Sequence, residues 1–291
     1  MLDPQSICLA VVTYFPEKSF FDRFPALSRR FGGCVVVDNQ SPVETIHRLK
    51  DLGKGVDVIL NPSNLGLGCA LNQATRKAVE RAFSWVLLLD QDSDLDEGFL
   101  QAYGDALAAC DSPNRLAVIG NNYSYAVDSD QVPLIPEKDL SHPFVECKAV
   151  ITAGSLVSLP TYGEIGPFRE DFFIDWIDTE YCYRARRKGY KVGMVTQPVV
   201  RQTIGHTIQV PSVVGAIRTT NHSAFRRYYM TRNLILLSKE YAFFEPLWFV
   251  ARFYDVLITT FKILISEKDR KAKIGSMLKG TIDGIIGSRR K

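Results

Sequence analysis

The 291-residue sequence predicts an α/β fold: a mainly parallel twisted sheet flanked by helices, with a helical C-terminal extension. Strand-like apolar runs alternate with helical patterns from the N-terminus to about residue 110; the runs lie at 7–13, 34–38, 56–61 and 85–90. Few polar residues interrupt them, which is typical of parallel strands buried on both faces. This alternation favours right-handed crossovers and a doubly wound sheet. From about His222 the pattern becomes helical, and it is strongly apolar between Phe243 and Ile265.

The intervening segments follow ordinary start and stop signals. Ser41 and Pro42 indicate the start of a helix, because Ser is a favoured N-cap residue and Pro is accepted in the first helical turn. The helices expected before the middle of the chain are 17–30, 41–52, 64–82 (after a glycine-rich turn) and 96–110. Residues 121–145 are rich in Asn, Ser, Asp and Pro and predict a loop. Beyond it we expect two short strands within 148–159, broken near Gly154, and a late strand at 192–195.

Composition excludes several classes of protein. The formal net charge is +3, so no general nucleic-acid affinity is indicated. Six cysteines are widely spaced without a CxxC pair, which favours free thiols in a reducing compartment. The apolar stretch near the N-terminus is too short for a signal peptide, so we expect a cytoplasmic protein. The hydrolase elbow GxSxG, the metalloprotease motif HExxH and the Walker loop are not found in the sequence.

Polar residues follow three of the predicted strands where each strand ends. Thr13 with Tyr14, Asp38 with Asn39, and the acidic pair Asp90 and Asp92 occupy these positions. The carboxyl ends of parallel strands meet at one crevice, where open α/β sheets bind ligands. Two carboxylates one residue apart suit a hard divalent cation that also takes phosphate oxygens. The alternative is a set of ordinary turn residues, with Ser93, Asp94 or Asp96 capping the next helix.

Three further patterns have both a functional and a purely structural interpretation. Gly66 and Gly68 can let a phosphate approach a helix N-terminus, or can simply form a tight turn. They do not complete the dinucleotide-binding motif GxGxxG, because Leu71 stands at the position of its third glycine. The acidic cluster of Asp175, Asp178 and Glu180 can contain a general base, or can be an acidic helix start. His206 can be a metal ligand, or a surface or packing residue.

With these residues in order, the chain resembles the inverting glycosyltransferases of family 2, which have the GT-A fold. The matching motifs cover about residues 7–210: VVTY (11–14), VVVDNQS (35–41), NLGLGCALN (64–72), LLLDQDS (87–93), TAGSLVS (152–158) and FFIDWIDTEYCYRARRKGY (172–190). The sequence DQDS and the later motif RRYYMTRN (226–233) are most similar to bacterial rhamnosyltransferases.

The resemblance implies a role for each matching residue. Asp90 and Asp92 are the DxD pair, in which Asp92 chiefly binds Mg²⁺ or Mn²⁺ bridging the donor diphosphate, with His206 as a further candidate ligand. Asp178 matches the second acid of the family's ED pair and is the expected base. Ile177 replaces the Glu of that pair and Gln202 stands where relatives often have a metal-ligating His, so Asp175 remains a rival base. The remaining predicted donor contacts are Thr13, Tyr14, Asp38, Asn39, Asn64, Gly66, Gln91 and Arg232.

The resulting prediction is a two-domain enzyme: a catalytic domain over 1–215 and a helical region over 216–291. It transfers a sugar, L-rhamnose from dTDP-L-rhamnose, to a saccharide or lipid-linked acceptor in bacterial surface polysaccharide synthesis. The alternatives are a family member with a UDP-hexose donor, and a non-catalytic nucleotide-sugar-binding scaffold. From Lys262 onward nine Lys and Arg face three acids, so a peripheral contact with the inner face of the plasma membrane is expected. A homodimer-forming or core helix is the alternative for this region.

Overall fold

The computed structural model describes residues 2–287 except 123, 128–129, 134–141, 198–199, 202–207 and 213–214; side chains are described for 2–122, 142–197 and 219–287. By their internal contacts these residues form two compact units. Unit 1 comprises Met1–Glu170 and Asp178–Thr203, and unit 2 comprises Asp171–Ile177 and Ile204–Lys291. The predicted division into a catalytic domain (1–215) and a helical region (216–291) stays a prediction.

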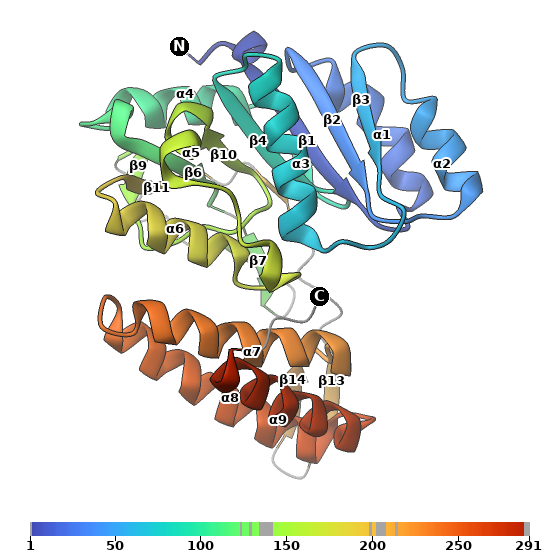
Figure 1. The fold of residues 1–291 in the computed structure, drawn as a ribbon, viewed down its shortest axis with the longest axis vertical. Helices are drawn as coiled ribbons and strands as arrows, with labels where there is room; N and C mark the ends of the chain where they lie inside the picture. Colours follow the sequence, from blue (N-terminus) through green and yellow to red (C-terminus); the bar gives the residue numbers. More distant parts are fainter. Residues whose placement is uncertain are drawn as a thin grey trace. The chain divides into compact units, whose positions relative to one another are not determined.

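Unit 1 is built on a mixed, mostly parallel eight-stranded sheet, as the sequence predicts (Figure 1). Its order is β3 (Val56–Leu60), β2 (Gly33–Asp38), β1 (Ile7–Thr13), β4 (Trp85–Asp90), β10 (Ser155–Ser158), β6 (Leu116–Gly120), β11 (Lys191–Val195) and β9 (Phe144–Glu146). β3, β2, β1 and β4 are parallel, and so are β6 and β11. In register, Thr13 of β1 lies beside Asp38 of β2, and Val12 lies beside Asp90 of β4, so these strand ends meet at one edge.

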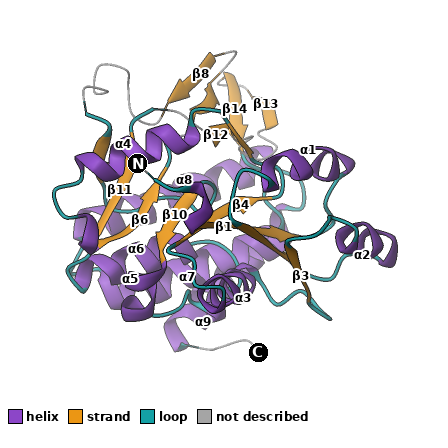
Figure 2. Cartoon of the chain, turned by 90° about the horizontal axis from the view of Figure 1, so that it is seen from above, coloured by secondary structure: helices purple, strands orange, loops and turns teal. Residues whose placement is uncertain are grey.

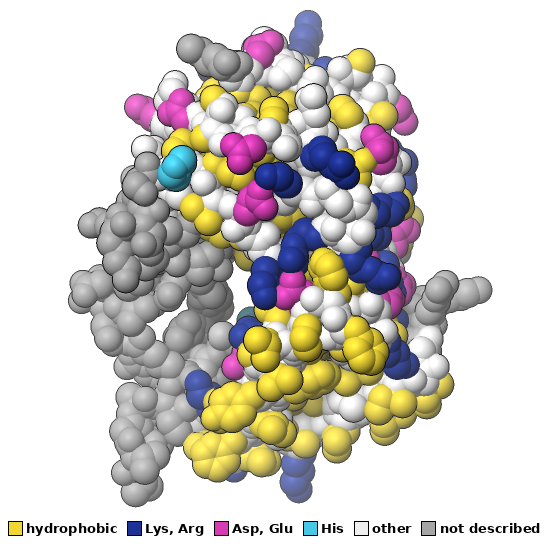
Figure 3. All heavy atoms as spheres, turned by 90° about the vertical axis from the view of Figure 1, so that its left-hand side faces the viewer, with side chains coloured by type: hydrophobic (Ala, Val, Ile, Leu, Met, Phe, Trp, Pro, Cys, Tyr) yellow, Lys and Arg dark blue, Asp and Glu magenta, His cyan; other side chains and the backbone are white. Residues whose placement is uncertain are grey.

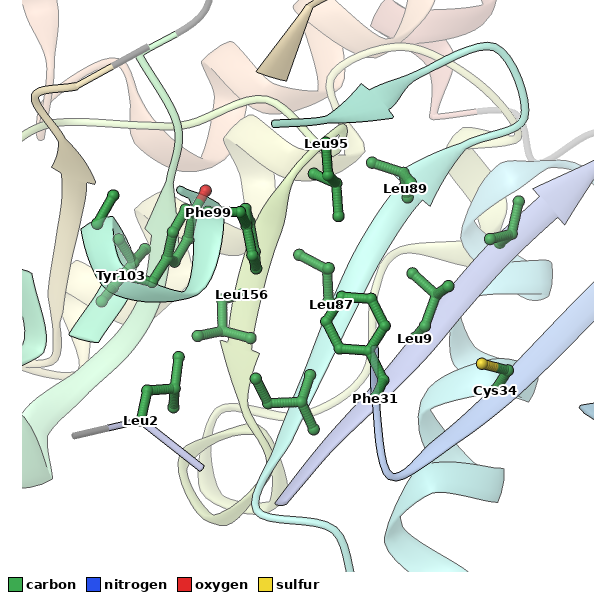
Figure 4. Close-up of a cluster of buried hydrophobic side chains, with 14 of the residues drawn as sticks. Leu2, Leu9, Phe31, Cys34, Leu87, Leu89, Leu95, Phe99, Tyr103 and Leu156 are labelled. Carbon is green, nitrogen blue, oxygen red and sulfur yellow. The ribbon is translucent and has the colours of Figure 1, made fainter. Parts of the chain in front are cut away.

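Helices cover both faces of this sheet (Figure 2). They are α1 (Lys18–Ser28), α2 (Val43–Lys50), α3 (Leu67–Glu80), α4 (Phe99–Ala109), α5 (Leu159–Ile165) and α6 (Ile177–Arg187), with 3-10 turns at Pro4–Ser6, Pro113–Arg115 and Glu170–Phe172. On one face, alternate strand residues such as Leu9 and Leu87 pack with Phe99 and Tyr103 of α4 in a single buried cluster (Figure 4). The intervening residues, among them Ala10 and Leu88, are equally buried. Burial on both faces explains why β1, β2 and β4 are apolar almost to their last residues.

Three predictions about the middle of unit 1 are wrong. The expected loop 121–145 contains strands β7 (Ser124–Val127), β8 (Asp130–Pro133) and β9, and no strand was expected at β6. The region 148–159 contains one strand, β10, rather than two. β7 and β8 pair with each other antiparallel and join β5 (Asp94–Leu95) and β12 (Val200–Arg201) in a second sheet of order β5-β12-β7-β8. In β7 and β8, strand-forming residues such as Tyr125 and Val132 stand beside turn formers such as Ser124 and Pro133, so the sequence does not reveal these short strands.

Unit 2 contains the hairpin β13 (Ile208–Ser212) and β14 (Gly215–Thr219), followed by the predicted helical region: α7 (Ala224–Tyr241), α8 (Pro246–Ser266) and α9 (Arg270–Ile286). A buried ionic cluster joins these helices. Glu267 accepts hydrogen bonds from Lys273 Nζ at 2.7 Å and Arg227 Nη2 at 3.3 Å, and also from the Thr219 hydroxyl. Burial raises the pKa of the Glu267 carboxyl, but the hydrogen bonds from Lys273 and Thr219, together with the charges of Arg227 and Lys273, lower it overall. Among the described residues, no helix combines the length and apolarity needed to cross a bilayer.

Candidate active site

The ends of β1 and β2 are tied together by the carboxylate of Asp38. This side chain is 1 % exposed and accepts hydrogen bonds from Thr13 Oγ1 at 2.9 Å, Ser41 N at 2.7 Å and Ser41 Oγ at 2.5 Å. Ser41 Oγ in turn accepts from Phe15 N at 2.9 Å. Phe15 and Gln40 both adopt left-handed backbone conformations at these strand ends. Non-glycine residues rarely do so, and such strain concentrates at functional sites.

Asn39 connects the strand ends to the glycine-rich turn. Its side-chain oxygen accepts from Asn61 Nδ2 at 2.9 Å, and its amide donates to the carbonyl of Gly66 at 3.3 Å. Asn64 Oδ1 accepts from Gly66 N at 2.9 Å, which closes the turn before α3. Asn39, Asn64 and Gly66, predicted separately as donor contacts, thus belong to one hydrogen-bonded network.

The two glycines of this turn are needed for different reasons. Gly66 has a φ of +84°, a conformation that strains any residue with a Cβ. At Gly68 a Cβ would lie 2.4 Å from the carbonyl oxygen of Arg169, so the protein's own backbone occupies that space. The loop before α3 is therefore held rigidly, whether or not a phosphate approaches it.

The acidic pair lies where β4 ends. Asp90 is half-buried, whereas Asp92 is exposed and accepts no hydrogen bond within the described part of the chain. Between them, Gln91 pairs with the main chain of Tyr14: Tyr14 N donates to Gln91 Oε1 at 2.8 Å, and Gln91 Nε2 donates to Tyr14 O at 3.2 Å. The structure thus brings together Thr13, Tyr14, Asp38, Asn39, Asp90, Gln91 and Asp92 at one edge of the sheet.

Within the described ranges, no three His, Cys, Asp or Glu side chains form a cluster that can hold a metal ion. Gln202 and the predicted ligand His206 lie outside the described residues. Asp90 and Asp92 stay predicted metal ligands, and a cation bound by two carboxylates would take its other ligands from a substrate or from solvent.

Asp178, the predicted base, lies in unit 1 at the N-terminus of α6. Its Oδ2 accepts from Thr152 N at 3.1 Å, and its Oδ1 accepts from Thr179 N at 2.7 Å. Both donors and the positive end of the helix dipole stabilise an ionised carboxylate. The TAGSLVS motif contributes Thr152, which joins Asp178 across 26 residues of sequence.

The rival acid Asp175 belongs to unit 2, where it has a different environment. Arg226 of α7 binds it at two points, with Nη2 to Oδ1 at 2.9 Å and Nε to Oδ2 at 3.1 Å. Asp175, Phe173 and Trp176 all have left-handed backbones. Asn233 Nδ2 holds this strained segment by donating to the carbonyls of Phe172 at 2.7 Å and Ile174 at 2.8 Å.

Arg232, a predicted donor contact, is fully buried in unit 2. Its Nη1 donates to Asp171 O at 2.8 Å and to Asn233 Oδ1 at 2.9 Å. The motif RRYYMTRN therefore supplies three residues that bind the segment 171–177. The sequence analysis did not identify Arg226 and Asn233 as partners of the segment 171–177. Their place in the motif RRYYMTRN was the only local sign of such a role.

Comparisons with known proteins agree with this architecture. Residues 33–153 match the family model described as Glycosyl transferase family 2. The chain is 27 % identical to the dTDP-rhamnosyl transferase RfbF of Shigella flexneri, over 97 % of this chain and 96 % of that protein.

Solved structures share the fold at low sequence identity. GalNAc-T7 with UDP, GalNAc and Mn²⁺ superposes with a TM-score of 0.58 at 16 % identity, over 80 % of this chain and 47 % of that one. TarS 1–349 of S. aureus superposes with a TM-score of 0.52 at 13 % identity, over 98 % of this chain and 72 % of that one. The chain thus spans about half the length of the GalNAc-T7 structure. The domain match, the full-length relative and the shared architecture together show a glycosyl transferase family 2 domain over residues 33–153 and the GT-A fold.

Proposed function

We propose that this glycosyltransferase is an inverting, metal-dependent rhamnosyltransferase that uses dTDP-L-rhamnose. The single observation that supports the donor most is the relative RfbF, a dTDP-rhamnosyl transferase aligned over nearly the whole of both chains. Incubation with dTDP-L-rhamnose, UDP-glucose and UDP-galactose, followed by product analysis, tests the choice. Consumption of a UDP-hexose instead of dTDP-L-rhamnose would favour the alternative donor. Binding of nucleotide sugars without turnover or hydrolysis would favour a non-catalytic scaffold.

A divalent cation, Mg²⁺ or Mn²⁺, fits the carboxylate pair. Asp92 is exposed and makes no hydrogen bond to the described residues, and Asp90, two residues earlier at the end of β4, is half-buried. Hard oxygen ligands and room for phosphate oxygens are what such cations require. When bound, the cation supplies charge stabilisation for the leaving diphosphate. Asp90 and Asp92 would hold it, and the GT-A structure of GalNAc-T7 contains Mn²⁺.

The chain's own residues then account for the remaining steps. Asp178, positioned by hydrogen bonds from Thr152 N and Thr179 N, accepts the proton of the acceptor hydroxyl. The hydroxyl oxygen forms a bond to the anomeric carbon while the bond to the diphosphate oxygen breaks, and the electron pair leaves with the diphosphate. One displacement inverts the anomeric centre and requires no covalent intermediate. The acceptor in this proposal is a saccharide or lipid-linked glycan.

The nucleotide crevice is expected to prefer a thymine or uracil base. Asp38 uses three of the roughly four lone-pair sites of a carboxylate, and the imide N–H of these bases needs one acceptor. The exposed rings of Tyr14 and Phe15, 4.5 Å apart, offer an apolar surface beside it. Calorimetry should show tighter binding of dTDP and UDP than of ADP and GDP. Tight binding of GDP or ADP, without any response to dTDP or UDP, would contradict both the crevice and the donor.

We further propose that α8 rests on a lipid surface at the cytoplasmic side of the membrane. Its six most exposed apolar residues recur every three or four positions, which places them on one side of the helix. They are Leu247, Val250, Tyr254, Leu257, Phe261 and Leu264. The charged residues of the helix, Arg252, Asp255 and Lys262, fall outside this stripe. Figure 3 shows hydrophobic side chains gathered in a broad area over the helices of unit 2.

Charge and local shape favour lipid over a second copy of the chain as the occupant of this stripe. Phe243, in the turn before α8, is fully exposed, and single exposed aromatic side chains suit the headgroup boundary of a bilayer. Exposed Lys268, Arg270 and Lys271 follow the helix directly and complement anionic headgroups. A lipid-linked acceptor would then share a surface with the enzyme. A homodimer through the same stripe is the competing outcome.

Acidic substitution of the stripe separates these outcomes. The double variant Val250→Glu/Leu257→Glu should lose co-sedimentation with anionic vesicles at low salt, because buried charge is costly in lipid. Val79→Glu, an exposed valine of α3 in unit 1, is the matched control and should bind as the original protein does. If the unaltered chain does not bind vesicles, and light scattering shows a dimer that the double variant disrupts, the stripe is a dimer interface.

A further inference from the structure

Arg23 of α1 and Arg30, two residues after the end of α1, bind the backbone of the loop that contains the acidic pair. Arg23 donates from Nη2 to Gln91 O at 3.1 Å and from Nη1 to Ser93 O at 3.0 Å. Arg30 donates from Nη1 to Leu95 O at 3.2 Å and from Nη2 to Asp96 O at 3.0 Å. Four carbonyls of residues 91–96 are thereby held by two planar cations.

The same loop is fixed on two other sides. Leu95 is buried beside Leu89 in the core cluster (Figure 4), so the chain is anchored after the acidic pair. Within the pair, Gln91 makes its two hydrogen bonds to Tyr14 N and Tyr14 O, which anchors the loop to the end of β1. The loop is therefore held at residue 91, at 93 and across 95–96, while the carboxylate of Asp92 projects between these points and stays exposed.

The arginines are not placed to bind a ligand phosphate themselves. Arg23 uses Nε as well, donating to Ser19 O at 3.1 Å, so each of its three nitrogens is engaged with main chain. Both side chains are half-buried. Charge-assisted hydrogen bonds to carbonyls are stronger than neutral ones, and the guanidinium fork fixes their geometry. Lysine carries the same charge but cannot reach two carbonyls at fixed angles.

We propose that Arg23, Arg30 and Gln91 form a loop clamp, a set of positioning residues that preorganises Asp90 and Asp92 for the metal–diphosphate group. A catalytic group displaced by about 1 Å can lose about 10²-fold in rate, so rigid support of this loop has direct value. The catalytic consequence rests on the proposed function. The effect of the clamp on loop order does not, because it concerns the protein alone.

The test compares the double variant Arg23→Lys/Arg30→Lys with Arg29→Lys, an exposed neighbour on the same helix end. Hydrogen exchange of the amides of 91–96 should accelerate by about tenfold or more in the double variant and remain unchanged in the control. The Mn²⁺ concentration giving half-maximal dTDP-L-rhamnose turnover should rise by about tenfold, with much of kcat recovered at saturating metal. Gln91→Ala should show the same pattern, because it removes the attachment to Tyr14.

The outcomes distinguish this inference from the proposed function. Unchanged exchange at 91–96 in both the arginine and Gln91 variants would overturn the clamp, whatever the activity. Faster exchange with an unchanged metal requirement in an active enzyme would overturn its positioning role. Faster exchange in a protein whose unaltered form has no metal-dependent turnover would refute the proposed function and leave the clamp established as a structural device.

Discussion

Replacing Asp92 by alanine should abolish sugar transfer and weaken metal-dependent binding of the donor. Its carboxylate is exposed, accepts no hydrogen bond within the described residues and follows β4 at the edge where Thr13 and Asp38 also lie. Charge stabilisation by a bound cation is worth several kcal/mol, so turnover should fall by about 10³-fold or more. Turnover of dTDP-L-rhamnose and calorimetric binding of dTDP with and without Mn²⁺ measure the effect.

Asp94→Ala is the matched control for this prediction. Asp94 is a second exposed acid, two residues further along the same loop, and its Oδ1 accepts only from the neighbouring Leu95 N among the hydrogen bonds of the described chain. It should retain most of the activity and the original metal dependence. If Asp92→Ala were nearly as active as the unaltered enzyme and EDTA were harmless, the metal-dependent mechanism would have to be abandoned.

Asp178→Asn should lose catalysis while keeping donor affinity. The substitution is nearly isosteric and removes the carboxylate that we propose as the general base, and general-base assistance is typically worth about 10²–10⁴-fold in rate. Asp175→Asn should behave differently, because it breaks the two-point ion pair with Arg226 and should lower stability by about 1 kcal/mol. Measurement of kcat, donor Kd and Tm for both variants separates the two roles.

Arg226→Gln provides an internal check on Asp175. If Asp175 has a structural role, removing either partner of the pair should give the same fall in Tm and the same moderate loss of activity. The assignment of the base would pass to Asp175 if Asp175→Asn lost turnover at unchanged Tm while Asp178→Asn and Arg226→Gln stayed active.

The sequence predicted those features that depend on neighbouring residues. Strands β1, β2 and β4 are continuous apolar runs up to their last residues, and the polar residues that end them are local signals of the crevice. β10 is different, because it lies antiparallel between β4 and β6 and obtains its hydrogen bonds from strands about 40–70 residues away in sequence. Nothing in the composition of Ser155–Ser158 specifies that insertion.

The same distinction applies to the candidate site. Asp38 was predicted from its position at a strand end, but its three hydrogen bonds from Thr13 and Ser41 depend on side-chain geometry that spacing does not encode. The pairing of Asp175 with Arg226 spans 51 residues, so the cluster of acids before α6 looked uniform in sequence. The structure separates it into an acid bound by Arg226 in unit 2 and an acid at the N-terminus of α6 in unit 1.

The segment Asp171–Ile177 limits how chimeras can be built between this protein and its relatives. It lies in sequence between two stretches of unit 1, yet its contacts assign it to unit 2, where Arg226, Arg232 and Asn233 hold it. The C-terminal helices therefore cannot be exchanged between relatives by joining two sequences at a single point. A chimera joined after Thr203 would pair the new α7 with a foreign segment and leave three left-handed residues without their matched supports. Exchange between relatives has to carry both pieces together.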